Sequence, residues 1–448
     1  MANEHYDIIV IGVGMAGLNV VRRTAKAGKK VAVIDLRPYG GTCALRGCDP
    51  KKVLVGAAEL VDWQRRMKGS GVTGELNINW ADLMAFKRTF TEPVPENLEK
   101  GLSKLDVATY HGGAHFVDSN ALRVGEETLK AEHIVIAAGA KPLTLDIPGA
   151  EHLTTSTDFL KLESLPKRLI FIGGGYISFE FAHIAARAGA DVTILHRGER
   201  PLEGFDADLV QRLVTASEEL GITVQVETEA QKVEKVGESF KVHTNQARTF
   251  NADLVVHGAG RVPEIDGLEL SAGGVEHDLK AGIKVNAYLQ SISNPAVYAA
   301  GDSADTEGLP LTPVAVSEGL VVASNLLKGN QRTPDYAGTP SVVFTTPSLA
   351  RAGLDEAQAE AQGLSFTVNH QDTSGWYTSR RVGEPHSAFK VVVEKDTGRI
   401  LGAHLLGAHA GEVINMFALA IRHGFTDHDL KTSIYVHPAA SSDVGYMV

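Results

Sequence analysis

Short apolar runs recur along the chain, and the first ends in a glycine turn. Residues 8–12 form an apolar strand pattern that leads into Gly12-x-Gly14-x-x-Gly17. A helical pattern follows through Lys26, and a second strand pattern covers residues 30–35. Strand, glycine turn, helix and strand in this order are typical of a dinucleotide-binding unit.

The same order returns about a third of the way along the chain. A strand pattern at 169–172 meets Gly173-x-Gly175, a helical pattern runs through Ala188, and a strand pattern covers 191–195. The chain is therefore predicted to contain two nucleotide-binding units, the second inserted into the first.

Further strand patterns end at small residues, at 134–140, 254–260 and 297–302. From about residue 335 the pattern changes. Residues 388–394 and 400–406 are predicted to be antiparallel strands joined by a turn at 395–398, with helices near 411–423 and 427–431 after them. The predicted fold class is α/β, with two Rossmann-like domains followed by a C-terminal α+β module.

Composition narrows the function classes. The 448 residues suit several domains, and hydrophobic (44%) and charged (22%) fractions are those of a globular protein. The net charge of -11 is mixed along the chain, so we expect neither nucleic-acid nor membrane partners. No apolar run reaches the ~20 residues that span a bilayer. The polar start, residues 1–7, lacks a secretory signal pattern, and we expect a cytoplasmic protein.

The chain has only two cysteines, Cys43 and Cys48. A disulfide scaffold would use more cysteines and a structural zinc site needs four ligands, so we expect redox chemistry and no metal site. Glycines lead into a predicted helix start, where two cysteines at this spacing can approach each other in a slightly distorted helix. A helix N-terminus stabilises a thiolate. The alternative is a pair of buried structural cysteines.

The first glycine turn has the parts that a dinucleotide needs. Gly12 permits the tight turn, Gly14 lets the backbone approach a diphosphate, and Gly17 lets helix and strand pack closely. Asp35 ends the second strand, where a carboxylate binds a ribose hydroxyl and disfavours a 2′-phosphate. FAD fits this site, and the alternative is a packing turn without a nucleotide.

In the second unit, Gly173 and Gly175 form the corresponding turn, and His196 stands where the ribose-binding acid would be. Arg197 and Arg200 follow it. A guanidinium favours a 2′-phosphate, so these residues favour NADPH over NADH. The alternative is a solvated basic loop, because Glu199 and Glu203 alternate with the arginines.

Several motifs in order carry a family resemblance. They are the first glycine unit, Gly40 to Lys52 (GGTCALRGCDPKK), Gly173 to Glu180, Ala259 to Pro263, Ala300 to Asp302, Leu311 to Ala315 and His437-Pro438. With them the chain resembles the two-cysteine pyridine nucleotide-disulfide oxidoreductases, the family of glutathione reductase, dihydrolipoamide dehydrogenase and mercuric reductase. The resemblance implies FAD-binding parts at 1–148 and 268–333, an NAD(P)H-binding domain at 149–267 and a dimerisation domain at 334–448.

The resemblance also implies residue roles. Cys48 would be the thiolate beside the flavin, and Cys43 the thiol that attacks the substrate. Lys52 and Glu180 would form an ion pair near the flavin, and His437 would reach the partner subunit's site as acid/base, which implies a homodimer. FAD would further contact Gly41, Thr42, Gly139, Gly301 and Asp302, and NADPH would contact Gly173, Gly175, Tyr176, Ile177 and Gly260.

Departures from the family pattern bear on the substrate. Ser442 stands where a glutamate usually orients the histidine, and Asp443 comes one place later. Either Asp443 replaces that glutamate after a local shift, or the imidazole is held less firmly. Arg22, Arg23 and Arg46 are candidates for binding a carboxylate-bearing substrate, against the alternative that Arg22 and Arg23 lie on a solvated helix face.

We expect an NADPH-dependent reductase of a small, acidic, low-molecular-weight disulfide. Three alternatives stay open. One is a dihydrolipoamide dehydrogenase-like NAD enzyme, which His196 and Arg197 disfavour. Another reduces a non-disulfide oxidant such as a metal ion or quinone. The third is a flavoprotein with a redox-sensing or binding role, which the missing glutamate after His437 motivates.

Overall fold

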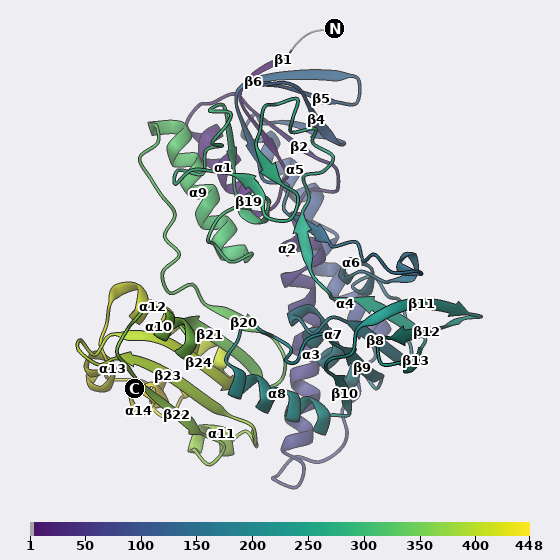
Figure 1. The fold of residues 1–448 in the computed structure, drawn as a ribbon, viewed down its shortest axis with the longest axis vertical. Coiled ribbons are helices and arrows are strands. Elements are labelled where there is room, and N and C mark those ends of the chain that lie inside the picture. Colours follow the sequence, from purple (N-terminus) through teal and green to yellow (C-terminus); the bar gives the residue numbers. More distant parts are fainter. Residues whose placement is uncertain (1–3) are drawn as a thin grey trace. The chain divides into compact units, whose positions relative to one another are not determined.

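The computed structural model describes residues 4–448, which separate into two compact units (Figure 1). Residues 1–3, part of the polar start considered above, lie outside the described residues. The first unit contains residues 4–50, 86–143 and 260–336, and the second contains 51–85, 144–259 and 337–448. Each unit is thus assembled from three separate segments of the chain.

The first unit is built on a seven-stranded sheet in the order β3-β2-β1-β6-β5-β4, with β18 paired to β6. Neighbours around β1 run parallel, whereas β4, β5 and β6 run antiparallel. The apolar residues of β1 are buried, as expected for a central strand covered on both faces. The strands are β1 (Glu4–Ile11), β2 (Val31–Asp35), β3 (Ala108–His111), β4 (Ala114–Asp118), β5 (Ala121–Val124), β6 (Glu127–Ile136) and β18 (Val297–Ala299).

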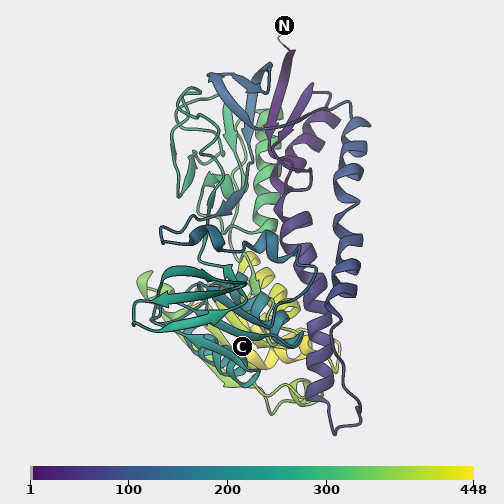
Figure 2. The same cartoon turned by 90° about the vertical axis from the view of Figure 1, so that its right-hand side faces the viewer.

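Two helices lie side by side in this unit, α1 (Met15–Lys26) and α9 (Thr312–Lys328), as Figure 2 shows. Smaller β elements complete the unit: β7 (Ala140–Pro142) paired with β15 (Arg261–Pro263), and a sheet of β16 (His277–Asp278), β17 (Gly282–Lys284) and β19 (Ala304–Asp305). The remaining helical elements are α2 (Gly41–Arg46), α5 (Val94–Ser103) and η2 (Gly301–Ser303). Two helices continue from one unit into the other, α3 (Cys48–Arg66) and α4 (Trp80–Thr91).

The second unit contains a four-stranded parallel sheet in the order β10-β9-β8-β14. It also contains an antiparallel sheet of β11, β12 and β13. The elements are β8 (Arg168–Ile172), β9 (Asp191–Leu195), β10 (Ile222–Gln225), β11 (Ala230–Val236), β12 (Ser239–Thr244), β13 (Thr249–Ala252), β14 (Leu254–His257), η1 (Ala150–His152), α6 (Ser156–Phe159), α7 (Tyr176–Arg187) and α8 (Ala207–Glu219).

The C-terminal part of the second unit is a five-stranded antiparallel sheet in the order β20-β21-β24-β23-β22, with α12 packed on β21 and β24. The predicted strands at 388–394 and 400–406 and the two predicted helices are confirmed. The elements are β20 (Ser341–Val343), β21 (Ser348–Gly353), β22 (Phe366–Asp372), β23 (Ala388–Glu394), β24 (Ile400–Gly407), α10 (Glu356–Ala361), α11 (Tyr377–Arg380), α12 (Ala410–His423), α13 (Asp427–Thr432), η3 (Ala440–Asp443) and α14 (Val444–Met447).

The predicted fold class is confirmed, since both strand–glycine turn–helix–strand series form parallel α/β layers and an antiparallel module follows. One local expectation changes. The cysteine segment is not one distorted helix, because α2 ends at Arg46 and α3 begins at Cys48, with Gly47 in a non-helical conformation between them. Among residues 4–448, we find no helix with the length and apolar character required to cross a membrane.

Candidate active site

The first glycine turn leaves no room for side chains. Gly12 has φ +99, and a Cβ there would lie 2.2 Å from the carbonyl oxygen of Ala137, the residue that follows β6. A Cβ on Gly17 would lie 2.0 Å from the Gly12 carbonyl oxygen. Only glycine therefore permits this turn to pack between β1 and the start of α1.

A second glycine turn meets the first. Gly41 has φ +67, and a Cβ on it would lie 2.5 Å from the Cα of Gly14. The backbones of Gly14 and Gly41 thus lie close together at the start of α1, with no side chain between them. Thr42 follows Gly41 in the chain. Exposed backbone N–H groups at a helix start form a cradle for a diphosphate, so this region fits the diphosphate of a dinucleotide such as FAD.

Asp35 is fixed at the end of β2 by two backbone hydrogen bonds. Its carboxylate accepts the N–H of Val13 at 2.8 Å and the N–H of Arg37 at 2.9 Å. Each carboxylate oxygen retains a lone pair that can accept a ribose hydroxyl. The predicted carboxylate therefore lies beside the glycine turn, in the position that ribose binding requires.

Arg46 belongs to a charged cluster at this end of the first unit. It interacts with Arg37, Asp35, Glu264 and Arg261. Burial, together with the neighbouring guanidinium of Arg37, lowers the pKa of Arg46. A guanidinium that is destabilised by neighbouring cations is stabilised by an anion, and a diphosphate supplies one.

The arginines considered for substrate binding thus lie in different surroundings. Arg46 is next to the nucleotide-site carboxylate, whereas Arg22 and Arg23 are exposed on α1.

The two cysteine side chains interact directly, although they belong to different helices. Cys48 Sγ lies 3.4 Å from the Thr312 hydroxyl at the start of α9. The hydrogen bond with Cys48, followed by burial, raises the pKa of the Cys43 thiol, and Thr312 acts in the opposite direction. The break at Gly47 brings the thiols together at the start of α3.

Asp302 and Gly301 are positioned by a buried glutamate. Glu318 of α9 accepts the Gly301 N–H at 2.6 Å, and it also accepts the hydroxyls of Thr306 (3.0 Å) and Tyr336 (2.6 Å). Burial raises the pKa of both Glu318 and Asp302. One hydrogen bond from Gly301 thus ties the turn that carries Asp302 to Glu318, and the other two hold the Glu318 carboxylate in place. Gly139, with φ +73, and Gly260, with φ +120, belong to the same unit and have open space where a Cβ would be.

The predicted ion pair between Lys52 and Glu180 is wrong. Lys51 makes it, with Nζ 2.7 Å from Glu180 Oε1 and both side chains at most 10% exposed. Lys52 instead pairs with exposed Glu59 at 3.0 Å. Successive helical residues point about 100° apart, so only one of two adjacent lysines on α3 can face the buried side. Glu180 also accepts the Phe344 N–H at 2.8 Å.

The second glycine turn is closed by His196. A Cβ on Gly173 would lie 2.6 Å from Ala259 Cα, and Gly175 precedes α7, which Tyr176 and Ile177 begin. His196 Nδ1 accepts the Gly174 N–H at 3.2 Å, while Nε2 lies 2.9 Å from the Arg200 carbonyl oxygen. With Nδ1 as acceptor and Nε2 as donor, the imidazole is neutral and supports the turn.

The two arginines after His196 have different surroundings. Arg200 donates to the carbonyl oxygens of Phe205 at 2.7 Å and Glu203 at 3.1 Å, which stabilises its own loop. Arg197 is exposed beside the turn. Of the two, Arg197 is therefore better placed to bind a nucleotide phosphate.

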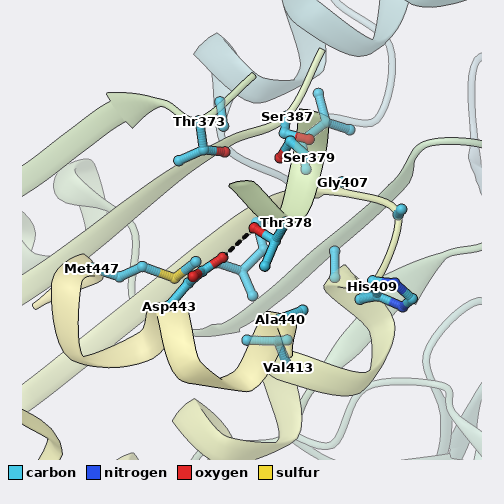
Figure 3. A pocket seen from close by; sticks show the side chains of 15 residues that line it. Thr373, Thr378, Ser379, Ser387, Gly407, His409, Val413, Ala440, Asp443 and Met447 are labelled. Atoms are coloured by element: carbon cyan, nitrogen blue, oxygen red, sulfur yellow. Dashed lines mark hydrogen bonds between the residues drawn. The ribbon is translucent and has the colours of Figure 1, made fainter. Parts of the chain in front are cut away.

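His437 is exposed in the segment after α13. Asp443 accepts a hydrogen bond from Thr378, as Figure 3 shows, at the edge of a cavity of about 60 Å³. Burial raises the pKa of Asp443, while Thr378 and the charge of His437 act in the opposite direction. Asp443 thus bonds to Thr378, and the charge of His437 acts on its carboxyl group.

Four residues of these sites were missed by sequence reasoning: Lys51, Asp49, Thr312 and Glu318. Lys51 and Lys52 are adjacent, and no pattern in the sequence decides which is buried. Thr312 stands in a recognised motif, but its contact with Cys48 joins positions 264 residues apart. Asp49, whose Oδ1 lies 3.9 Å from Cys43 Sγ, and Glu318 have no local signal of their own.

Family models match nearly the whole chain. The model described as pyridine nucleotide-disulphide oxidoreductase matches residues 6–319. The model for the dimerisation domain of the same group matches residues 339–448.

Individual relatives span the chain. Glutathione reductase from Nostoc sp. is 32% identical and covers 98% of each chain. Dihydrolipoyl dehydrogenase from Bacillus subtilis is 31% identical, covering 96% of this chain and 93% of its own. Mercuric reductase from Lysinibacillus sphaericus is 31% identical over 96% of this chain and 80% of its own.

Among solved structures, the HOCl-induced flavoprotein disulfide reductase RclA from Escherichia coli, in a Cu(II) complex, is similar to this chain. It has a TM-score of 0.89 and 27% identity, and covers 100% of this chain and 99% of its own.

Proposed function

Because the chain belongs to the pyridine nucleotide-disulphide oxidoreductase family, whose members are enzymes that use FAD with NAD(P)H, we propose that it is an NADPH-dependent reductase of a small disulfide. The observation that carries this proposal is the direct interaction of two cysteine side chains, Cys43 in α2 and Cys48 at the start of α3, next to the glycine turn at Gly41.

Under this proposal, two nucleotide sites supply electrons to the two cysteines. FAD would be held in the first unit by Gly12, Gly14, Gly17, Gly41, Thr42 and Gly139, with Asp35 available to its ribose and Gly301 and Asp302 to its ribityl chain. When bound, FAD passes the electron pair of the nicotinamide to the cysteines. NADPH would be held by Gly173, Gly175, Tyr176 and Ile177 of residues 149–267. Arg197 provides the preference for its 2′-phosphate, and Arg200 supports that loop.

The thiols perform the exchange. The Cys43 sulfur attacks one sulfur of the substrate disulfide, releases a first thiol and forms a mixed disulfide. Cys48 then attacks the Cys43 sulfur, which releases the second thiol and leaves the Cys43–Cys48 disulfide for reduction. His437 of the partner subunit gives protons to the departing thiolates. The protein is thus a homodimer formed through residues 334–448, and it acts in the cytoplasm.

The test is NADPH oxidation by the flavin-loaded protein with glutathione disulfide, cystine, lipoamide, coenzyme A disulfide and cystamine. We expect turnover of at least one disulfide. Cys43→Ser and Cys48→Ser are expected to abolish it, while NADPH still bleaches the visible absorbance of the bound flavin. Turnover of disulfides by both variants would contradict the proposal. Replacing NADPH with NADH tests the nucleotide preference, and faster reaction with NADH would favour a dihydrolipoamide dehydrogenase-like enzyme.

A second candidate function is reduction of a metal ion or another non-disulfide oxidant. The similarity to RclA, whose structure is described as a Cu(II) complex, favours it. NADPH oxidation that depends on Cu(II), persists in the absence of any disulfide and requires both cysteines would support this candidate. If bound flavin is reduced but neither disulfides nor Cu(II) are turned over, the redox-sensing alternative gains support.

A further inference from the structure

Asp49 stands directly after Cys48, in the first turn of α3, and is exposed. α2 ends at Arg46 and α3 begins at Cys48, and Gly47 between them has a backbone conformation outside the helical region. Asp49 Oδ1 lies 3.9 Å from Cys43 Sγ, with the thiol as donor. A carboxylate is therefore in contact with the thiol that we propose attacks the substrate.

The groups that act most on the Cys43 thiol within residues 4–448 are Cys48, Thr312 and Asp49, and none of these is a cation. Nearby basic residues are engaged elsewhere. Lys51 pairs with Glu180, Lys52 pairs with Glu59, and Arg46 interacts with the cluster around Asp35. Among these groups the charge that acts on Cys43 is thus the negative charge of Asp49, whereas low-pKa reactive cysteines normally lie near positive charge.

A negative charge at this distance has two effects. It disfavours a second negative charge on the sulfur, and the charge of Asp49 contributes to the raised pKa of the Cys43 thiol. It also repels an anionic disulfide that approaches the sulfur, whereas a cationic disulfide is attracted. Arg22 and Arg23 are exposed on α1 and do not belong to the groups named above, so they give no basis for an acidic substrate at Cys43.

We propose that Asp49 is a specificity-determining residue beside the Cys43 thiol, and that it selects neutral or cationic disulfides over anionic ones. The inference rests on the proposed function, in which Cys43 is the substrate-attacking thiol.

The first experiment measures Cys43 without any turnover. In a Cys48→Ser background Cys43 is the single cysteine, and its alkylation rate is followed against pH with neutral iodoacetamide and anionic iodoacetate. Asp49→Asn is expected to lower the pH midpoint of alkylation by about half to one pH unit and to raise the iodoacetate rate relative to iodoacetamide by about fivefold. Asp49→Glu restores the charge and is expected to keep the original values.

The matched control is Glu126→Gln, which removes an exposed carboxylate from the β5–β6 turn of the same unit. It is expected to change neither quantity. The same titration in a His437→Ala background separates the effect of Asp49 from that of the histidine. An unchanged midpoint and an unchanged reagent ratio in Asp49→Asn would overturn the inference.

The second experiment measures NADPH-driven turnover with both cysteines intact. We expect kcat/KM for cystamine, which is cationic, to exceed that for glutathione disulfide, which is anionic. Asp49→Asn is expected to reduce this ratio by about fivefold. Equal ratios in the two proteins would overturn the substrate preference. Absence of all disulfide turnover, together with an altered alkylation profile, would count against the proposed function while leaving the action of Asp49 on Cys43 established.

Discussion

Adjacent lysines on α3 have opposite surroundings. Lys51 is buried with Glu180, and Lys52 is half-exposed with Glu59. Removing one partner of a buried pair leaves an uncompensated charge, which costs about 3 kcal/mol, whereas an exposed pair contributes at most about 1 kcal/mol. We expect Lys51→Met to lower the thermal denaturation midpoint clearly and Lys52→Met to leave it nearly unchanged. A larger effect of Lys52→Met would contradict the pairing and restore the prediction from sequence.

Arg46 provides a second test at the scale of one residue. Its guanidinium interacts through charge with two other arginines, Arg37 and Arg261, and with two carboxylates, those of Asp35 and Glu264. An FAD diphosphate would stabilise this cluster through charge-assisted hydrogen bonds. We expect Arg46→Ala to weaken FAD binding to the apoprotein by about tenfold, measured by quenching of flavin fluorescence, with a smaller salt dependence than the native protein. Arg22→Ala is the control, and an equal loss in that variant would show that Arg46 has no specific role.

What the sequence could predict at this scale depends on whether a role is set locally. Gly12, Gly17 and Asp35 follow from strand, turn and spacing; the structure shows the close packing at both glycines and the hydrogen bond from Val13 to Asp35, while the cofactor roles stay predictions. The identity of the buried lysine depends on which face of α3 packs against α7, and the contact of Thr312 with Cys48 depends on tertiary structure. Neither is encoded in a neighbouring residue.

At the scale of elements, the start of η2 depends on Glu318 of α9, whose carboxylate accepts the Gly301 N–H. Burial raises the pKa of this carboxyl above its ordinary value of 4.5, so the folded state binds the proton more tightly than the unfolded state. The resulting stabilisation is fully present below pH 4.5 and is lost as pH rises through the folded-state pKa. Glutamine does not titrate, and we expect the stability of Glu318→Gln relative to the native protein to increase as pH rises from 4.5 to neutrality.

Urea unfolding across this pH range measures the difference, and Glu126→Gln, which removes an exposed carboxyl, is expected to show no such trend. A relative stability of Glu318→Gln that falls with rising pH would contradict the assignment.

Strands and helices themselves were predicted well where their pattern was periodic, as in β8 (Arg168–Ile172), α7 (Tyr176–Arg187) and β23 (Ala388–Glu394). The exception is the cysteine segment, which was expected to be one helix. Gly47 has φ -146 and ψ -112 there, a conformation outside the helical region, and the close approach of Gly41 to Gly14 fixes where α2 lies. The break falls on a glycine, a residue of low helix propensity, whereas the contact between the two turns joins positions distant in sequence and has no local signal.

For the whole molecule, apolar side chains are exposed along the C-terminal module. Ile434, Val436, Leu419 and Tyr446 are each more than half exposed. A homodimer would bury such a surface, since exposed apolar groups gain most from association. We expect Ile434→Asp combined with Val436→Asp to produce a monomer by light scattering, and Ile292→Asp, an exposed apolar position in the other unit, to leave the dimer intact. A monomeric native protein would contradict the proposed assembly.

A shared active site would give the dimer a property that neither subunit has alone. Under the proposed function each site takes its cysteines from one subunit and His437 from the other, so Cys48→Ser and His437→Ala homodimers are both impaired. In a mixed dimer, one site carries both substitutions and the other carries neither. With random pairing of equal amounts, half of the dimers are mixed and have one complete site of two, so about a quarter of the native activity should return. The measurement is NADPH oxidation after the two variants are coexpressed or unfolded and refolded together. Activity that stays at the mean of the two separate variants, while mass analysis confirms mixed dimers, would show that His437 serves the site of its own subunit or none.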